Sequence, residues 1–131
     1  MVNSASTAYR STVGGVLFAL GVIGASGAAL GQQAPRSFIA SPDVYKVVAQ
    51  NDEYLIVEVT WKPGQRDQFH SHAKALSYWL TDCNARFYTP DGKIVDATRT
   101  AGRAGAQGPV ASHSVENIGK SECRLVMFEP K

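Results

Sequence analysis

The sequence predicts an all-β domain preceded by an apolar leader, and three observations support this fold class. Short runs of β-branched and aromatic residues alternate with polar residues at a period of two. Twelve glycines and six prolines are scattered through the chain, many of them beside these runs, which is typical of a protein with many turns. After residue 31 no stretch shows helical periodicity, and 131 residues that are 44% hydrophobic leave room for one globular core.

The N-terminal segment has the composition of a secretory signal peptide. From Val13 to Leu30 every residue is apolar, Gly, Ala or Ser, and Arg10 is the only charge before it. We therefore expect residues 1–31 to be cleaved on export, which places the mature protein in the periplasm or outside the cell. The alternative is an uncleaved membrane anchor, because about 18 apolar residues approach the length of a bilayer span. Residues 32–42 are then expected to be a linker and residues 43–131 the folded domain.

The strands are predicted from alternation and from the turns between them. In the run 54–61, Leu55, Val57, Val59 and Trp61 share one face, which predicts a strand with a buried side. The segment 101–108 is poor in strand-forming residues and is expected to be a loop or a weak strand. About eight antiparallel strands in so short a chain favour a sandwich or a barrel. The other strands are expected at 44–50, 68–72, 76–80, 85–89, 94–98, 110–115 and 123–128.

The charges and the cysteines narrow the function classes. Thirteen Lys and Arg residues stand against eleven Asp and Glu residues, without a basic stripe, so nucleic-acid binding is not expected. Cys83 and Cys123 are the only cysteines, and in an oxidising compartment such a pair suggests a disulfide. Two buried free thiols are the alternative, since sequence does not show whether the two Cα atoms approach each other.

The three histidines of the chain are the candidate metal ligands. His70 and His72 share a face if the segment 68–72 is extended, and His113 is the only other histidine. Neutral imidazole is a good ligand for Zn, Fe, Ni and Cu ions. Three such ligands on one side of a metal leave the other positions open to water or substrate. The pattern therefore predicts one metal site with open positions.

The motifs around these histidines resemble those of the cupin family. Gly64, followed after five residues by His70-Ser71-His72, is similar to the start of the first cupin motif, and His113 with Asn117 is similar to the end of the second. The resemblance covers roughly residues 43–129, and the second motif is similar to that of small cupins grouped with β-alanine degradation. It implies an all-β, cupin-type β-jelly-roll barrel of about eight antiparallel strands that binds a divalent metal.

One ligand of the family motif is missing. The motif normally places a Glu four or five residues after the second histidine, where this chain has Leu76 and Ser77. The resemblance implies that three-histidine cupins include iron dioxygenases, so iron is the first candidate metal, with Zn, Ni, Mn and Cu as others. Asp67 has the opposite strand parity to the histidines, so no carboxylate is expected beside them, which disfavours hydrolysis. The alternatives to an oxidoreductase are a non-catalytic metal- or ligand-binding protein and a degenerate cupin acting as an interaction module.

Several further residues are candidates for contact with a small organic substrate. Gln68 shares a strand face with the histidines, Ser77 stands where the family has its Glu, and Tyr78 could line the mouth of a barrel. Composition favours a solvent-facing position for Gln68 and core packing for Tyr78. Arg86 and Arg99 could hold an anionic substrate, although exposed strand arginines are commoner. The run 43–50 is a candidate edge strand through which a homodimer could form.

Overall fold

The computed structural model describes residues 33–131, which form nine strands and one short helix. The helix, α1 (Ser37–Ala40), precedes all the strands. The strands are β1 (Tyr45–Gln50), β2 (Tyr54–Trp61), β3 (His70–His72), β4 (Ala75–Trp79), β5 (Cys83–Tyr88), β6 (Ile94–Arg99), β7 (Ala104–Gln107), β8 (Val110–Asn117) and β9 (Cys123–Pro130).

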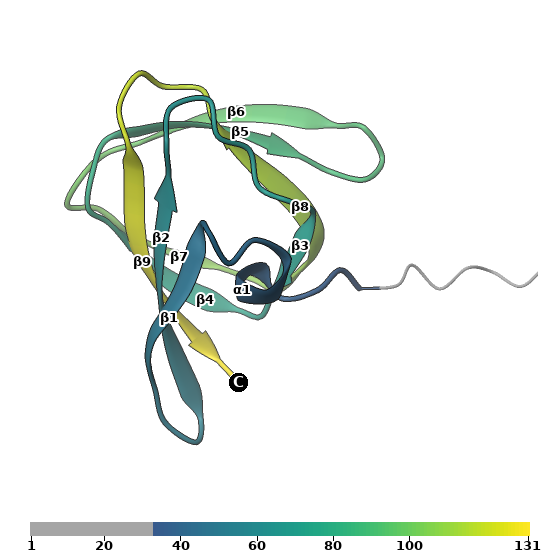
Figure 1. The fold of residues 1–131 in the computed structure, drawn as a ribbon, viewed down its shortest axis with the longest axis vertical. Coiled ribbons are helices and arrows are strands. Elements are labelled where there is room, and N and C mark those ends of the chain that lie inside the picture. The colour runs from purple at the N-terminus through teal and green to yellow at the C-terminus, as the bar shows by residue number, and fades with distance from the viewer. Residues whose placement is uncertain (1–32) are drawn as a thin grey trace, which may run out of the picture. The chain divides into compact units, whose positions relative to one another are not determined.

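The strands form two antiparallel sheets that face each other, so the predicted all-β barrel is confirmed. The strand order is β1-β2-β9-β4-β7 in one sheet and β3-β8-β5-β6 in the other. In Figure 1 the five-stranded sheet runs along the left and lower sides of the domain and the four-stranded sheet along the right and upper sides. Strand β1 is an edge strand, as the homodimer hypothesis requires, and β3 is an edge strand of the other sheet.

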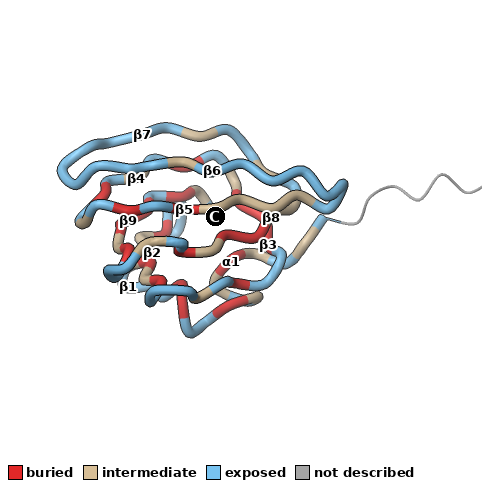
Figure 2. The backbone as a smooth tube through the Cα atoms, turned by 90° about the horizontal axis from the view of Figure 1, so that it is seen from above, coloured by how far each residue is buried: buried red, intermediate tan, exposed pale blue. Residues whose placement is uncertain are grey.

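The core is built on β2 and β9, which pair along their whole length from Tyr54↔Pro130 to Trp61↔Cys123. The predicted face of β2 is buried, because every second residue from Leu55 to Trp61 points inward. Strand β9 alternates in the same way, and its inward positions are Cys123, Leu125, Met127 and Glu129. Figure 2 shows the buried residues concentrated in β2, β9 and the segments around β3, whereas β6 and β7 are largely exposed. One of the inward positions of β9, Glu129, carries a charged side chain.

A disulfide joins the two sheets. It links Cys83, the first residue of β5, to Cys123, the first residue of β9, with their Cα atoms 5.1 Å apart. Both residues are buried beside the hydrophobic core. Because the two cysteines are separated by 40 residues, the bridge closes a long loop and restricts the unfolded chain.

The structure has one strand more than the sequence predicted, and the difference lies in the segment 101–108. Residues Ala104–Gln107, which have low strand propensity, form β7 by pairing with β4 from Ala75↔Gln107 to Tyr78↔Ala104. A Cβ atom at Gly105 would lie 3.4 Å from the Ser77 hydroxyl oxygen, so the small residues of β7 suit its close approach to β4. Pairing with an existing strand therefore overrides local propensity here.

The expected linker at 32–42 is wrong for the residues that the structure describes, because residues 33–42 pack against the barrel. Ser71 donates its backbone N–H to the Pro35 carbonyl at 2.7 Å, and Arg36 forms a parallel β-bridge with Ser71. Ser37 in α1 is fully buried. A single turn of helix is too short to show periodicity in the sequence, which is why this segment was missed.

The predicted signal peptide, and its alternative as an anchor, lie outside the described residues. Within residues 33–131 no helix has the length and apolar character needed to cross a membrane.

Candidate metal centre

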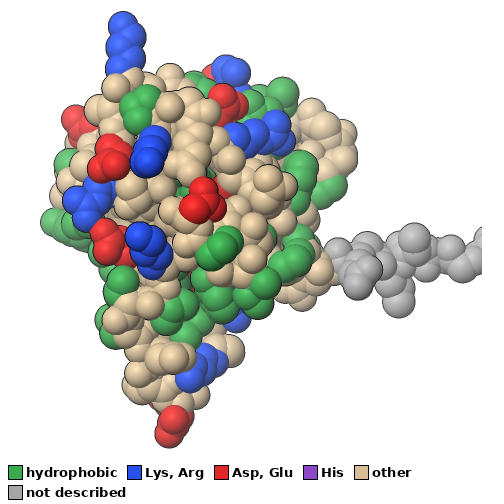
Figure 3. Space-filling view, viewed as in Figure 1, with side chains coloured by type: hydrophobic (Ala, Val, Ile, Leu, Met, Phe, Trp, Pro, Cys, Tyr) green, Lys and Arg blue, Asp and Glu red, His purple; other side chains and the backbone are tan. Residues whose placement is uncertain are grey.

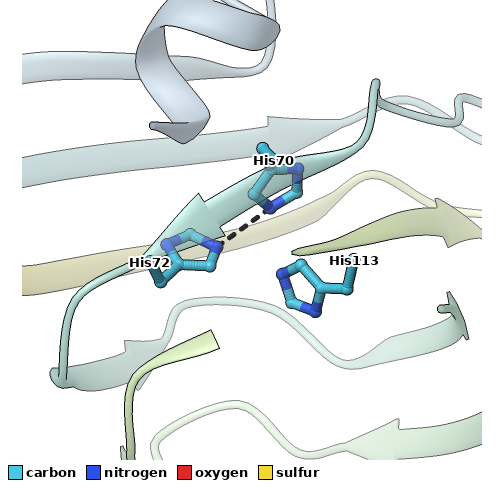
Figure 4. A group of neighbouring side chains, drawn as sticks. All are labelled: His70, His72 and His113. Atoms are coloured by element: carbon cyan, nitrogen blue, oxygen red, sulfur yellow. Dashed lines mark hydrogen bonds between the residues drawn. The ribbon is translucent and has the colours of Figure 1, made fainter. Parts of the chain in front are cut away.

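The three histidines meet inside the barrel, as the motifs predicted. Antiparallel pairing of β3 with β8 sets His70 directly opposite His113, and a register shift follows before His72. One ring nitrogen from each histidine lies within 4.8 Å of the others. Figure 4 shows the three rings turned toward one another, His70 and His72 from one strand and His113 from its neighbour. The chain therefore holds three imidazoles at the spacing of one metal site.

His70 and His72 are shielded from solvent, and His113 is half-buried. His70 and His72 are 0% and 2% exposed, and Ser71 between them is also buried because the segment around Pro35 covers β3. Figure 3 shows one face of the domain, where positive and negative side chains are interspersed and no histidine is visible. All three residues of β3 are therefore buried, although neighbouring residues of a strand point to opposite faces.

Hydrogen bonds at Nδ1 orient two of the rings. His70 Nδ1 donates to the Gln68 carbonyl oxygen at 2.8 Å, and His72 Nδ1 donates to Glu129 Oε1 at 2.6 Å. With the ring protons on Nδ1, each Nε2 carries a lone pair, and these two Nε2 atoms lie 2.9 Å apart. Two lone pairs so close repel each other unless a proton or a cation lies beside both. A bound metal satisfies that requirement, and bonding of Nδ1 to an acceptor is the usual arrangement of metal-bound histidine.

His113 completes the donor set. Its Nε2 is buried, and no hydrogen-bond partner for it is present among the described residues. Burial, reinforced by the charges of His70 and His72, lowers the pKa of His113 to about 3, so this ring is neutral at physiological pH. Burial also lowers the pKa of His70, although the nearby Asp67 opposes the change. Neutral imidazole with an unpartnered nitrogen is the form that binds a metal, so the three residues fit a divalent transition metal.

The metal-free domain is expected to lose stability as the pH falls from about 6.5 toward 3. The pKa of His113 is about 3 in the folded state and near 6.5 in the unfolded chain, so the unfolded chain takes up the proton first. For one such histidine the free energy of unfolding falls by up to about 1.4 kcal/mol per pH unit in this range. Urea unfolding at pH 7 and pH 4.5, after chelation, measures the slope. The His113→Gln variant should have a smaller slope. Equal stability of the unsubstituted domain at both pH values would contradict a lowered pKa of His113 in the folded state.

The carboxylate of Asp67, which strand parity predicted on the face opposite the histidines, lies beside His70. The expectation from strand parity is wrong because residues 67–69 precede β3 and do not follow its alternation. Asp67 is buried and its Oδ1 lies 3.5 Å from His70 Nδ1. Asp67 Oδ2 accepts hydrogen bonds from the Tyr45 hydroxyl at 2.8 Å and from Trp61 Nε1 at 2.9 Å, and Oδ1 accepts one from the Val115 backbone N–H at 2.7 Å.

Tyr45 lies between this carboxylate and the histidines. Its hydroxyl oxygen lies 3.1 Å from His70 Nε2, and the residue is 2% exposed. Burial raises the pKa of Tyr45 well above its ordinary value, and Asp67 raises it further, so the hydroxyl stays protonated and donates to Asp67. Asp67 therefore lies beside Nδ1 of His70, while the Tyr45 hydroxyl oxygen lies beside its Nε2.

Glu129 is a second carboxylate that the sequence reasoning missed. Its side chain is fully buried, and it accepts one hydrogen bond from His72 and one from Arg36, the latter through Oε2 at 2.6 Å. Burial acts to raise the pKa of Glu129, but the hydrogen bonds and charges of His72 and Arg36 outweigh it and lower the pKa. A signal was present, because Glu129 shares its strand parity with the apolar residues Leu125 and Met127. A charge at an inward strand position usually has a buried partner.

A cavity of about 360 Å³ opens beside the histidines, between the two sheets. Ser77 lines it, whereas the Gln68 and Tyr78 side chains are exposed and do not. The predictions of Gln68 and Tyr78 as contact residues are therefore not supported, and Ser77 is the one of the three that faces the site. The remaining lining is mostly apolar and comes from Tyr45, Trp61, Trp79, Phe87, Ala104, Gly105, Ala106, Val115, Leu125 and Met127, together with His72, Arg99, Arg103, Gln107 and His113.

Comparison with known proteins identifies the fold. No protein-family model matches the chain, and no curated protein sequence is detectably similar to it. A cupin domain from Bordetella pertussis superposes with a TM-score of 0.62 at 22% identity, covering 77% of this chain and 99% of that one. A conserved protein with a double-stranded β-helix domain from Klebsiella pneumoniae gives a TM-score of 0.53 at 19% identity, over 66% of this chain and 75% of that one.

A third solved structure supports the same conclusion. An RmlC-like cupin family protein from Methanocaldococcus jannaschii, with a double-stranded β-helix fold, gives a TM-score of 0.53 at 9% identity, over 66% of this chain and 78% of that one. Identities this low establish the fold and leave function to the site itself. The domain has the cupin, or double-stranded β-helix, fold, with three histidines close enough to bind one metal.

Proposed function

We propose that this protein is an exported metalloprotein that binds one divalent transition metal through His70, His72 and His113, with iron as the first candidate. We further propose that it oxidises a small organic molecule in the adjoining cavity. The observation that carries the metal site is the convergence of three imidazoles whose Nδ1 atoms, in His70 and His72, are already hydrogen-bonded to acceptors. That arrangement leaves Nε2 lone pairs directed at a common point.

The cavity supports oxidation more than hydrolysis. A metal held by three neutral imidazoles keeps open positions and would supply redox or Lewis-acid chemistry there. Among the described residues that line the cavity, none is Asp or Glu, so no carboxylate is placed to take a proton from a substrate. The chain's own contribution is a mostly apolar wall, and its polar groups come from Ser77, His72, His113, Arg99, Arg103 and Gln107.

The disulfide supports the proposal of export. Disulfides form and persist in oxidising compartments such as the periplasm and are rare in the reducing cytosol, and this domain has one between its two sheets. N-terminal sequencing of exported protein tests the cleavage, since an intact Met1 would show that the leader is retained.

Metal content tests the site directly. Protein purified without a chelating tag is expected to contain close to one equivalent of a transition metal by mass spectrometry. The variants His72→Ala and His113→Ala should each retain less than about a tenth of an equivalent, because three ligands are the minimum for such a site. Gln68→Ala is the matched control: it lies two residues before His70, its side chain is exposed, and its metal content should not change.

Two outcomes would overturn the metal site. One is a metal content below a tenth of an equivalent that added metal does not restore, and the other is a content that neither histidine substitution changes. If iron is present, oxygen uptake on addition of substrate distinguishes an enzyme from a binding protein. Uptake that requires both iron and the substrate supports the oxidase or oxygenase proposal, and binding of the substrate without uptake contradicts it.

A further inference from the structure

Two arginines stand at the cavity that contains the histidines. Arg99 is the last residue of β6 and Arg103 immediately precedes β7, so a short turn presents both to the same space. The turn is held in place: Gly102, with a φ of +77°, donates its N–H to the Trp79 carbonyl at 2.8 Å, and Trp79 donates its N–H to the Arg103 carbonyl at 3.0 Å. The backbone of the turn is therefore fixed, and both arginines are exposed at its surface.

The positive charge of these arginines is not neutralised by the protein. Within residues 33–131, Arg36, Arg86 and Arg124 each form an ion pair with a carboxylate, but neither Arg99 nor Arg103 has a carboxylate oxygen within 4.0 Å. Asp82, which precedes β5, accepts a hydrogen bond from the Ala101 backbone N–H and so fixes the turn. Two guanidinium groups beside an apolar cavity constitute an anion-binding arrangement.

The space between the arginines and the histidines is suited to an apolar body. Trp79, Trp61 and Phe87 form part of the cavity wall. The Arg99 guanidinium lies over the ring of Trp79, 5.9 Å from its centroid. Gln107 also lines the cavity, and its Nε2 is buried without a hydrogen-bond partner among the described residues. A volume of about 360 Å³ accommodates a small molecule rather than a polymer segment.

We propose that the cavity takes a small organic carboxylate, with the carboxylate held by Arg99 and Arg103 and the apolar body extending toward His72 and His113. This inference rests on the proposed function, because it names the substrate class of the same site. Arginine binds the planar carboxylate group through two parallel hydrogen bonds, which fixes one end of the molecule and thereby directs the other end toward the histidines. A neutral amide or alcohol of the same shape lacks that interaction.

The chain provides its own reporter of cavity occupancy. Its two tryptophans, Trp61 and Trp79, both line the cavity, so tryptophan fluorescence responds to a ligand there. Hexanoate and hexanamide form a matched pair of ligands without near-ultraviolet absorption, and hexyl phosphate tests the preference among anions. Dissociation constants are measured by fluorescence titration and confirmed by calorimetry, on metal-free and on metal-loaded protein.

Hexanoate is expected to bind at least about tenfold more tightly than hexanamide, in both forms of the protein. Arg99→Gln and Arg103→Gln should each weaken hexanoate binding about tenfold or more and leave hexanamide binding unchanged. Lys93→Gln is the control for the loss of one positive charge, because Lys93 is exposed at the tip of the β5–β6 hairpin and is not a lining residue.

Three results would overturn the inference: no binding of hexanoate, equal binding of hexanoate and hexanamide, or hexanoate binding unaffected in the Arg99→Gln/Arg103→Gln double variant. Tighter binding of hexyl phosphate than of hexanoate would overturn the choice of carboxylate. Metal content is measured independently of ligand binding. If the protein proves to bind no metal, the titration of metal-free protein still tests whether the two arginines bind a carboxylate. Hexanoate binding lost on metal removal but retained in the arginine variants shows direct coordination and contradicts the arginine site.

Discussion

Replacing Asp67 with Asn is expected to lower the free energy of unfolding by about 3–5 kcal/mol. The buried carboxylate accepts three hydrogen bonds, from Tyr45, Trp61 and the Val115 backbone. The amide of Asn has one oxygen and one NH2 group, so its NH2 must face a donor on one side of the network or the other. A buried donor is then left without an acceptor, and the negative charge near His70 is lost.

The matched control for Asp67→Asn is Asp96→Asn. Asp96 is also a hydrogen-bond acceptor, with two bonds from Arg86, but this pair is exposed on the β5–β6 hairpin, where water replaces a lost partner. Guanidinium unfolding of the disulfide-intact domain, followed by tryptophan fluorescence, measures both variants. The thermal midpoint of Asp67→Asn should fall by more than about 12 °C. A loss no larger than that of Asp96→Asn would show that the buried network does not stabilise the domain.

Replacing Glu129 with Gln is expected to weaken metal binding about 10- to 100-fold. Glu129 Oε1 accepts the His72 Nδ1 proton and Oε2 accepts a hydrogen bond from Arg36, so a single carboxylate orients a ligand and also holds the N-terminal segment. Gln keeps the shape but offers one oxygen to two donors. Either His72 loses the bond that fixes its ring, or Arg36 loses its buried partner, and in both cases the negative charge that increases imidazole basicity is gone.

Glu58→Gln is the control for Glu129→Gln. Glu58 also pairs with an arginine, Arg124, but on the partly exposed surface of the β2–β9 pair and away from the histidines. Competition with a chromogenic chelator measures the metal affinity, and circular dichroism verifies that each variant is folded. A Glu129→Gln variant that binds metal as tightly as the Glu58→Gln control would rule out a positioning role for Glu129.

The strands and the shared face of His70 and His72 could be predicted from the sequence because each depends on local periodicity. Leu55, Val57, Val59 and Trp61 alternate over a full strand, and alternation alone separates a buried from an exposed face. His70 and His72 alternate in the same way on a shorter strand, β3. The added knowledge of the cupin motifs brought His113 into the same site, and the register of β3 with β8 places it directly opposite His70.

Sequence patterns were insufficient wherever the structure of a segment depended on its contacts with segments distant in the sequence. Strand β7 forms although its residues have low strand propensity, because β4 presents an unpaired edge to it. Asp67 was assigned to the wrong face because parity was extended beyond the start of β3. The segment 33–42 was expected to be a linker because its helix is one turn long, yet it covers β3 and contributes Arg36 to the buried pair with Glu129.

By itself the sequence determined the fold class, the period-two strands and the imidazole pair of His70 and His72, since these follow from patterns between near neighbours, and the resemblance to the cupin motifs added the imidazole of His113. Only the tertiary structure decided which groups surround those imidazoles. Glu129 is 57 residues from His72, and the turn carrying Arg99 and Arg103 is brought to the same cavity by strand pairing across two sheets. The reason is physical: partners for buried charge and walls for a cavity are set by contacts between distant strands, which leave no periodic signal in the chain.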